Sequence, residues 1–168
     1  MQVTTKLPVT IRPLMPQEAS FLREMIYEAM YIPAEEEHPP REIVDQPPIR
    51  KYIADWGRHG DAAWVATANG ALIGATWYRL FPEDDPGYGF LNARTPEISI
   101  ALRPGFRDQG VGSKLLKTLL RHAADAGFEA VSLSVDVRNP ATRLYARLGF
   151  EEVERIGYVS LMQYRFRR

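Results

Sequence analysis

Apolar residues recur along this chain at two spacings, and the strand-like spacing is the more frequent. Residues 62–68 and 72–81 are rich in apolar and β-branched side chains, and Asn69-Gly70 between them is a strong signal for a two-residue hairpin turn. Short apolar or alternating runs bounded by turn residues predict five further strands, at 9–13, 96–102, 131–137, 150–155 and 158–166. The chain is therefore expected to build a sheet that contains at least one antiparallel pair.

Apolar residues three or four positions apart predict helices in the remaining segments. The clearest stripe runs through Val111, Leu115 and Leu119, and Gly127 stands where the C-terminus of that helix would be capped. The predicted helices cover 17–31, 49–56, 110–126 and 139–149. The proline-rich segment 32–48 is predicted to be a loop with at most short helical pieces.

The order of these elements indicates a mixed fold. The strand–helix–strand unit from 96 to 137 requires two parallel neighbours, whereas the hairpin favours antiparallel pairing. We therefore predict an α/β (α+β) fold in which a mixed, mostly antiparallel sheet is flanked by helices. The length of 168 residues suits one domain that spans residues 1–168.

Composition and charge narrow the classes of function. The 21 Lys and Arg balance the 21 Asp and Glu, and this net charge of 0 argues against broad capture of nucleic acid or of an anionic membrane. The chain has no Cys, which excludes disulfides, thiolate metal sites and a cysteine nucleophile. No segment reaches the length of a membrane span, and residues 1–10 lack the apolar core of a secretory leader. We expect a cytoplasmic protein without a metal cofactor.

The segment with the clearest chemical meaning joins a predicted strand to the strongest helix and reads Arg107-Asp108-Gln109-Gly110-Val111-Gly112-Ser113. Its two glycines allow a tight turn, and free N–H groups at a helix start attract phosphate. Two familiar phosphate motifs do not fit, because Val111 stands where the Walker A lysine would be and Leu115 where the third Rossmann glycine would be. A tight strand–helix connection without a ligand is the alternative interpretation.

Two longer patterns carry a family resemblance. In residues 96–116, a strand and a proline-containing turn lead into [RQ]-x-x-G-x-[GA], whose marked positions are Arg107, Gly110 and Gly112. Residues 136–150 follow with a second set of marked positions at Asn139, Tyr145, Gly149 and Phe150, while Thr142 departs from the usual Ala or Ser. In this order the two segments resemble motifs A and B of the GNAT superfamily of N-acetyltransferases. The resemblance extends from about residue 62 to the end, and more loosely over the N-terminal elements.

The resemblance implies a site for acetyl-CoA, the co-substrate of this family. The main-chain N–H groups of residues 107–113 would receive its pyrophosphate. In the family two central parallel strands splay apart, commonly beside a β-bulge that would fall here at 98–101, and the pantetheine arm pairs with the exposed strand edge. That edge would consist of Ile100, Ala101 and Leu102. The following helix would add contacts from Asn139, Ala141 and Tyr145.

The resemblance also implies the catalytic groups. Tyr145 occupies the position that often supplies the acid for the leaving thiolate, and Glu97 is the best candidate for the base. Each has a plain structural alternative, since Tyr145 also suits a core and Glu97 the polar start of a strand. Many members of the family recruit the base through water or use none. His38, His59 and His122 are weaker candidates.

The acceptor is predicted only by class. The expected reaction transfers an acetyl group to a primary amine of a small molecule or a protein, by direct attack on the thioester. Acidic runs at 35–37 and 83–85, with Tyr31, Tyr88 and Phe90 nearby in sequence, would suit a cationic amine, although solvated acidic loops are the simpler interpretation.

Two other functions and one assembly stay open at this point. A CoA-binding sensor or scaffold without transfer activity would carry the same motifs. So would an acyltransferase that uses a longer acyl-CoA. The alternating segment 158–164 could be an edge strand that pairs across a homodimer.

Overall fold

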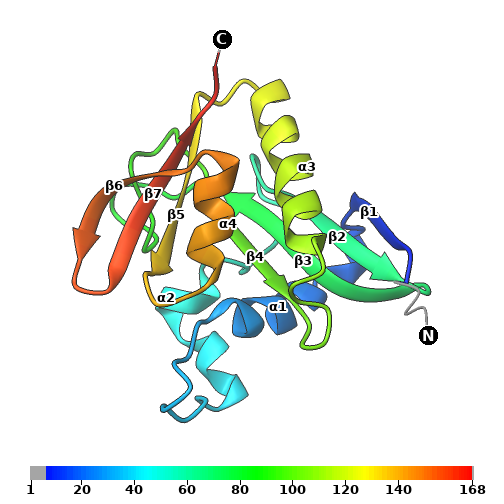
Figure 1. The fold of residues 1–168 in the computed structure, drawn as a ribbon. Helices are drawn as coiled ribbons and strands as arrows, with labels where there is room; N and C mark the ends of the chain where they lie inside the picture. Colours follow the sequence, from blue (N-terminus) through cyan, green and yellow to red (C-terminus); the bar gives the residue numbers. More distant parts are fainter. Residues whose placement is uncertain (1–6, 168) are drawn as a thin grey trace.

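Within residues 7–167 all strands join one sheet with helices on both faces (Figure 1). The computed structural model describes residues 7–167; of residues 1–10, where no secretory leader is expected, 1–6 lie outside the described part. The elements are β1 (Val9–Pro13), η1 (Pro16–Glu18), α1 (Phe21–Ala29), η2 (Arg41–Asp45), α2 (Pro47–Arg50), β2 (Ala62–Ala68), β3 (Ala71–Arg79), β4 (Glu97–Leu102), α3 (Val111–Asp125), β5 (Ala130–Asp136), α4 (Ala141–Leu148), β6 (Glu151–Ile156) and β7 (Val159–Arg165).

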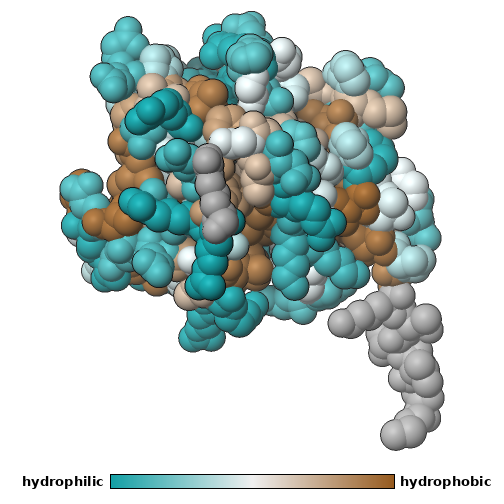
Figure 2. Space-filling view, turned by 90° about the horizontal axis from the view of Figure 1, so that it is seen from above, coloured by the Kyte–Doolittle hydropathy of each residue, from teal (hydrophilic) through white to brown (hydrophobic). Residues whose placement is uncertain are grey.

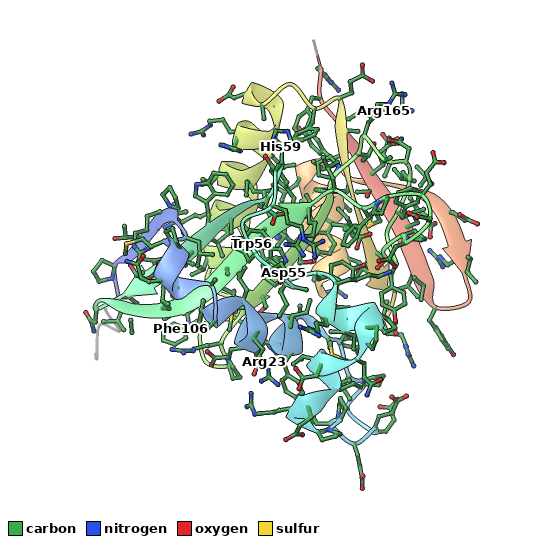
Figure 3. The ribbon with its side chains drawn as sticks, turned by 180° about the vertical axis from the view of Figure 1, so that it is seen from behind. Arg23, Asp55, Trp56, His59, Phe106 and Arg165 are labelled. Carbon is green, nitrogen blue, oxygen red and sulfur yellow. The ribbon has the colours of Figure 1, made fainter. Side chains whose placement is uncertain are left out.

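The strand order is β1-β2-β3-β4-β5-β7-β6. Only β4 and β5 pair in parallel, and every other neighbouring pair is antiparallel. The predicted mixed, mostly antiparallel sheet flanked by helices is therefore confirmed. In Figure 1, α3 and α4 lie in front of the sheet, whereas Figure 3, seen from behind, shows α1 and α2 on the opposite face, with Arg23 on α1.

Each face of the sheet has its own apolar core. On one face α3 buries Leu115, Leu116 and Leu119 completely, as its stripe predicts. On the other face α1 buries Leu22 and Met25 just as completely. Because side chains alternate along a strand, β4 sends successive residues into these two cores. The functional groups of β4 are thereby divided between the two faces.

The hairpin predicted at Asn69-Gly70 is present. Asn69 has φ 51° and Gly70 has φ 75°, the two left-handed positions that a type I′ turn requires. The next pair, β3 with β4, keeps a one-to-one register from Gly74 opposite Leu102 to Arg79 opposite Glu97. The β-bulge that the resemblance implied at 98–101 is therefore absent from this pairing.

Several predicted boundaries are wrong near prolines. The helix expected at 17–31 covers only Phe21–Ala29, because Pro16 opens the separate 3-10 turn η1. The helix expected at 49–56 is instead the short α2, which starts at Pro47 since proline is tolerated in a first helical turn. The chain then continues in turns as far as residue 55. The strand expected to reach residue 81 ends at Arg79.

The C-terminal hairpin differs from the expectation for a dimer contact. β7 lies between β5 and β6, so the segment 158–164 is not an edge strand. The prediction is wrong because β7 pairs with β5 from Val159 to Arg165 and is covered by β6 on its other side. β6 is the edge, and it carries a register shift between Glu152 and Glu154, a feature that discourages edge-to-edge pairing.

A buried ion pair fixes the segment between α2 and β2 against the sheet. The guanidinium of Arg79 donates to both carboxylate oxygens of Asp61, at 3.0 and 2.7 Å, and the two side chains are 1% and 3% exposed. Its remaining nitrogen donates to the carbonyls of Lys51 and Ala54. The ring of Trp56, labelled in Figure 3, lies 5.2 Å from the guanidinium carbon. With every donor group engaged, the buried charge holds this segment in one position.

Among residues 7–167, no helix is long and apolar enough to cross a membrane. In Figure 2 hydrophilic side chains cover most of the face seen from above, and hydrophobic side chains form several separate patches.

Candidate active site

A cleft opens where β4 and β5 separate. The two strands pair only at Glu97 and Ser132, where the amide of Ser132 donates to the carbonyl of Pro96 at 3.0 Å. Beyond that point the β5-facing edge of β4 is unpaired. The cleft has a volume of about 370 Å³. Its walls bring together residues from β4, β5, α1 and α4, among them Glu97, Ser99, Ile100, Asn139 and Tyr145.

Seven consecutive main-chain N–H groups are free at the start of α3. Within residues 7–167 the amides of residues 107–113 donate no hydrogen bond, and the first helical bond runs from Lys114 N to Gly110 O at 3.2 Å. Asp108 (φ 60°) and Gly110 (φ 81°) are left-handed, a conformation that gathers successive N–H groups into an anion-binding hollow. The positive end of the helix dipole adds to the attraction. The turn therefore has the properties of a phosphate site.

This turn lies against the cleft wall. A Cβ atom added to Gly112 would be 3.4 Å from Leu144 of α4 and 3.7 Å from Ile100 of β4. These are ordinary van der Waals distances, so packing alone does not require glycine at 112. At 110, in contrast, the left-handed backbone favours glycine.

The side chains of the turn are engaged away from the free amides. Arg107 donates to Glu28 of α1 at 3.1 Å, and Gln109 donates to the carbonyl of Gly105 at 2.9 Å. The side chain of Val111 is buried in the α3-side core. What this segment offers a ligand is therefore chiefly its main chain.

The strand residues expected beside the coenzyme arm fall on both faces of the sheet. Ile100 lines the cleft, Ala101 belongs to the α1-side core, and Leu102 packs against the α3-side core. Their common feature is the unpaired main-chain edge. A ligand that binds along all three residues must do so through backbone hydrogen bonds.

Asn139 caps α4 and also lines the cleft. Its Oδ1 accepts a hydrogen bond from the amide of Ala141 at 2.9 Å, while Pro140 directly precedes the helix. The amide of Ala141 is thus engaged, so this residue has only its side chain to offer a ligand. Within the described chain no partner holds the side-chain nitrogen of Asn139.

Tyr145 is almost buried, and its hydroxyl ends at the cleft. Its ring packs on Phe150 with centroids 5.8 Å apart, and the side chain is 7% exposed. The hydroxyl forms no hydrogen bond within residues 7–167, yet no fully buried polar side-chain atom of those residues lacks a partner. The hydroxyl must therefore reach the cleft surface. Burial raises the pKa of Tyr145 to about 12, which keeps the phenol protonated at neutral pH.

Glu97 is buried and held by hydrogen-bond donors. It is 3% exposed, and its Oε1 accepts the amide of Gly89 at 2.8 Å. The hydroxyl of Tyr52 lies close to the same carboxyl group, since a Cβ atom at Gly87 would be 2.5 Å from Glu97 Oε1 and 2.7 Å from that hydroxyl. Burial raises the pKa of Glu97 to about 7, against the opposing effects of Tyr52, Gly89 and the charge of Lys51. A carboxyl group that titrates near neutral pH is suited to take up a proton.

The sequence analysis missed the residues that build the Glu97 pocket. Tyr52 falls in the predicted helix 49–56 without a role, and Gly87 and Gly89 fall between the strands predicted at 72–81 and 96–102. A Cβ atom at Gly87 would be 2.5 Å from Glu97 Oε1, and one at Gly89 would be 2.7 Å from the main chain of Leu133. The spacing of two glycines can indicate a close approach of the backbone, but it does not name the partner.

Three tyrosines contribute to the lining of the cleft, namely Tyr31, Tyr52 and Tyr88. The rings of Tyr52 and Tyr88 stack with their centroids 6.5 Å apart. The acidic runs 35–37 and 83–85 are exposed.

Other candidate residues lie elsewhere. Phe90 packs against the α1-side core, and His38, His59 and His122 are absent from the cleft lining. His122 instead bonds to the hydroxyl of Tyr78 at 3.0 Å. In the described part of the chain, no three His, Asp or Glu residues gather in a way that could hold a metal ion.

Comparison with known proteins identifies the class that this fold and cleft define. Residues 23–150 match the Acetyltransferase (GNAT) family. The chain belongs to this family of acyltransferase enzymes, and the resemblance predicted from the two motifs is confirmed.

Individual relatives agree with this assignment. Mycothiol acetyltransferase of Saccharomonospora viridis is 29% identical over 119 residues, which cover 70% of this chain and 39% of that protein. N-acetyltransferase 8 of Rattus norvegicus is 28% identical over 104 residues, covering 61% of this chain and 44% of that protein. The chain thus spans less than half the length of these curated relatives.

Solved structures share the fold. PaiA N-acetyltransferase from Thermoplasma acidophilum, in complex with coenzyme A, matches with a TM-score of 0.68 at 18% identity and covers 95% of this chain and 100% of its own. A GNAT family acetyltransferase from Brucella melitensis, in complex with acetyl-CoA, matches with a TM-score of 0.60 at 21% identity, covering 97% and 91%.

Proposed function

We propose that this chain transfers the acetyl group of acetyl-CoA to a primary amine by direct attack of the amine on the thioester, and that residues 1–168 form one acetyltransferase domain. The observation that carries the proposal is the run of seven free N–H groups at 107–113, placed beside an unpaired strand edge. A diphosphate needs such donors, and the amides of a pantetheine arm need such an edge. The two related folds solved with coenzyme A or acetyl-CoA are consistent with this ligand.

The proposed binding residues follow from this fit. The amides of 107–113 hold the diphosphate, the main chain of Ile100, Ala101 and Leu102 receives the arm, and the side-chain nitrogen of Asn139 donates to it. When bound, acetyl-CoA supplies a thioester carbonyl that a neutral amine can attack. The chain has no Cys to act as a covalent nucleophile, and in this proposal the amine itself attacks the thioester.

Two side chains manage the protons in this proposal. As the nitrogen–carbon bond forms and the carbon–sulfur bond breaks, the Glu97 carboxylate takes the proton that the amine nitrogen loses. The Tyr145 hydroxyl donates a hydrogen bond to the departing sulfur, which leaves as the thiolate of coenzyme A and then takes a proton from water. The pKa of Glu97, about 7, and that of Tyr145, about 12, keep the first group available as a base and the second as a donor at neutral pH.

We extend the proposal to a cationic acceptor. The rings of Tyr31 and Tyr88 in the cleft lining can attract an ammonium group. The exposed acidic runs 35–37 and 83–85 would raise the local concentration of a cation. This class includes polyamines, aminoglycosides and lysine side chains.

The test is a transfer assay with purified protein. Acetyl-CoA is supplied with a panel of cationic and neutral primary amines, and both the free thiol and the mass of the acetylated amine are measured. We expect amine-dependent thiol release that is greatest with cationic amines and with the acetyl donor. Faster reaction with a longer acyl-CoA would mean that the natural donor carries a longer acyl group than acetyl. Saturable binding of acetyl-CoA without transfer to any amine would favour a CoA sensor and overturn the proposal.

A further inference from the structure

We infer that Tyr52 is a positioning residue, which orients the Glu97 carboxylate from the segment after α2 and links it to the backbone at 87–89. This inference rests on the proposed function, in which Glu97 takes the proton of the amine. It concerns a residue that neither of the two sequence motifs contains.

The Tyr52 hydroxyl has one hydrogen to give, and its neighbours determine where that hydrogen goes. Its oxygen accepts the amide of Tyr88 at 2.7 Å, and it lies close to the Glu97 carboxyl group, because a Cβ atom at Gly87 would be 2.5 Å from Glu97 Oε1 and 2.7 Å from the phenol oxygen. The amide of Tyr88 can only donate, so the hydrogen of the phenol is left for an acceptor, and the Glu97 carboxylate is the acceptor that we assign to it. Tyr52 is 6% exposed, so water does not compete freely for this bond.

The carboxyl group is held from a second direction by the backbone at 87–89. Gly89 donates its amide to Glu97 Oε1 at 2.8 Å, and its carbonyl accepts the Ser132 hydroxyl at 2.6 Å. A Cβ atom at Gly87 would be 2.5 Å from Glu97 Oε1 and 2.7 Å from the Tyr52 hydroxyl. The backbone therefore packs directly on both oxygen atoms, and Tyr52 bonds both to it and to Glu97.

Tyr52 is itself fixed by bonds to the sheet. Its carbonyl accepts the indole N–H of Trp77 at 3.2 Å, and its ring meets the ring of Phe81 edge-on at 5.0 Å. The preceding carbonyl, of Lys51, accepts a bond from the buried guanidinium of Arg79. A phenol anchored at backbone and ring can hold a carboxylate in one orientation.

The charged groups around Glu97 do not replace Tyr52. Arg79 lies opposite Glu97 on β3, but its guanidinium is paired with the carboxylate of Asp61. Lys51 pairs with Asp85 at 3.0 Å and with the carbonyl of Pro86, so it acts on Glu97 only through its field. From β5 the nearest polar side chain is Ser132, whose hydroxyl is committed to Gly89. Direct donation to the carboxyl group comes from Tyr52 and Gly89.

The test is Tyr52→Phe, with Tyr78→Phe as the matched control. Like Tyr52, Tyr78 is a buried tyrosine. It lies on β3, however, and its hydroxyl is bonded to His122 of α3. Carbon-13 NMR of labelled glutamate carboxyl groups follows the titration of Glu97 without any substrate, and Glu97→Gln identifies its resonance. Loss of a donor to the charged form should move the Glu97 midpoint up by about one pH unit in Tyr52→Phe and leave it unchanged in Tyr78→Phe. The acidic limb of the pH profile of kcat/KM should move by the same amount.

The outcomes separate this inference from the proposed function. An unchanged Glu97 midpoint in folded Tyr52→Phe, or an equal shift in both variants, overturns the role of Tyr52. A shifted midpoint in Tyr52→Phe alone supports the hydrogen-bond link. If no amine is then acetylated by the wild-type protein, the proposed function fails while the link stands.

A second measurement on the wild-type protein keeps the inference testable if Tyr52→Phe does not fold. In protein labelled at the tyrosine ring carbon that bears the oxygen, the Tyr52 resonance should report a titration with the Glu97 midpoint. That titration should vanish in Glu97→Gln. A Tyr52 resonance that is indifferent to the ionisation of Glu97 would overturn the inference.

Discussion

The turn at 107–113 exposes unpaired main-chain N–H groups, whereas Glu97, which lines the neighbouring cleft, is buried beside groups from distant segments. The turn obtains its chemistry from the backbone, and its side chains are engaged elsewhere. The Glu97 pocket depends on individual side chains and on two glycines that let the backbone approach. One region of the cleft is therefore encoded by a short continuous segment, and the other by contacts between residues 8 to 45 positions apart.

This contrast predicts different responses to substitution. A backbone site should fail when something enters the space in front of its amides, and it should tolerate changes in side chains that point away. A carboxylate site should fail when a single atom of its shell is changed. It should also show a dependence on pH that the backbone site lacks.

The largest effect is expected for Gly112→Glu. The new side chain would enter the narrow space beside Leu144 and Ile100, and its negative charge would face the free amides. We expect acetyl-CoA affinity to fall about 100-fold or more, since an unpaired like charge at an anion site costs several kcal/mol. Isothermal titration calorimetry measures the change.

Gly112→Ala is the matched control for this variant. Its added Cβ atom would be 3.4 Å from Leu144, a contact that small adjustments relieve, and it brings no charge. The affinity should fall by less than about tenfold. An equal loss in both variants would mean that packing, and not the anion site, controls binding.

The next effect is expected for Glu97→Gln. The amide keeps the size of the side chain but cannot take up the proton of the amine. We expect kcat/KM to fall about 100-fold or more at pH 7 with acetyl-CoA affinity unchanged. Glu154→Gln, at an exposed position of β6, is the control and should keep full activity. Full activity of Glu97→Gln would remove Glu97 as the base.

The same variant should change stability with pH in a defined direction. Because burial raises the pKa of Glu97 from its usual 4.5 to about 7, the folded state binds a proton more tightly than the unfolded state does. Stability from this group is present below pH 4.5 and is lost as pH rises through about 7. Relative to wild type, Glu97→Gln should therefore gain stability between these pH values, by up to about 3 kcal/mol in urea denaturation. A constant difference between the two proteins would contradict the burial of this charge.

The parts of the fold and site that sequence predicts are those with local causes. Asn69-Gly70, the α3 stripe and the glycines of the turn each act through backbone geometry or spacing, and each is where the pattern places it. The family resemblance supplied the splayed strands, and the single parallel contact at Glu97 agrees with it.

The missed parts have non-local causes. Tyr52 meets Glu97 only because α2 is shortened near its prolines and Arg79 holds the following turns against the sheet. The spacing of residues within this segment does not indicate the buried ion pair between Arg79 and Asp61. The edge position predicted for 158–164 failed for the same reason, since β6 covers β7 through a long-range pairing. The engaged side chain of Arg107 likewise depends on Glu28, 79 residues away.

The smallest catalytic effect is expected for Tyr145→Phe. Removing the hydroxyl takes one hydrogen bond from the departing sulfur but leaves the buried ring in place against Phe150. We expect kcat to fall roughly 10- to 100-fold, with little change in acetyl-CoA affinity. Because the pKa of Tyr145 is about 12, the activity of the wild-type protein should show no alkaline limb from this group below pH 9. Steady-state kinetics across pH checks both statements.

The control for this variant is Tyr164→Phe. Tyr164 belongs to the same ring cluster, with its centroid 5.4 Å from that of Phe150, but it does not line the cleft. It should retain the wild-type kcat. Equal turnover in Tyr145→Phe and wild type would remove Tyr145 as the donor to sulfur.

The central claim is that the main chain at 107–113 binds the diphosphate of acetyl-CoA. Nitrogen-15 heteronuclear NMR of the backbone amides tests it most directly, with acetyl-CoA titrated into the wild-type protein. If these amides bind the diphosphate, the seven amide resonances of 107–113 move together, saturate at one equivalent and shift more than those of the exposed loop 82–86. Saturable binding that leaves these seven resonances in place, or no binding at millimolar acetyl-CoA, would contradict it.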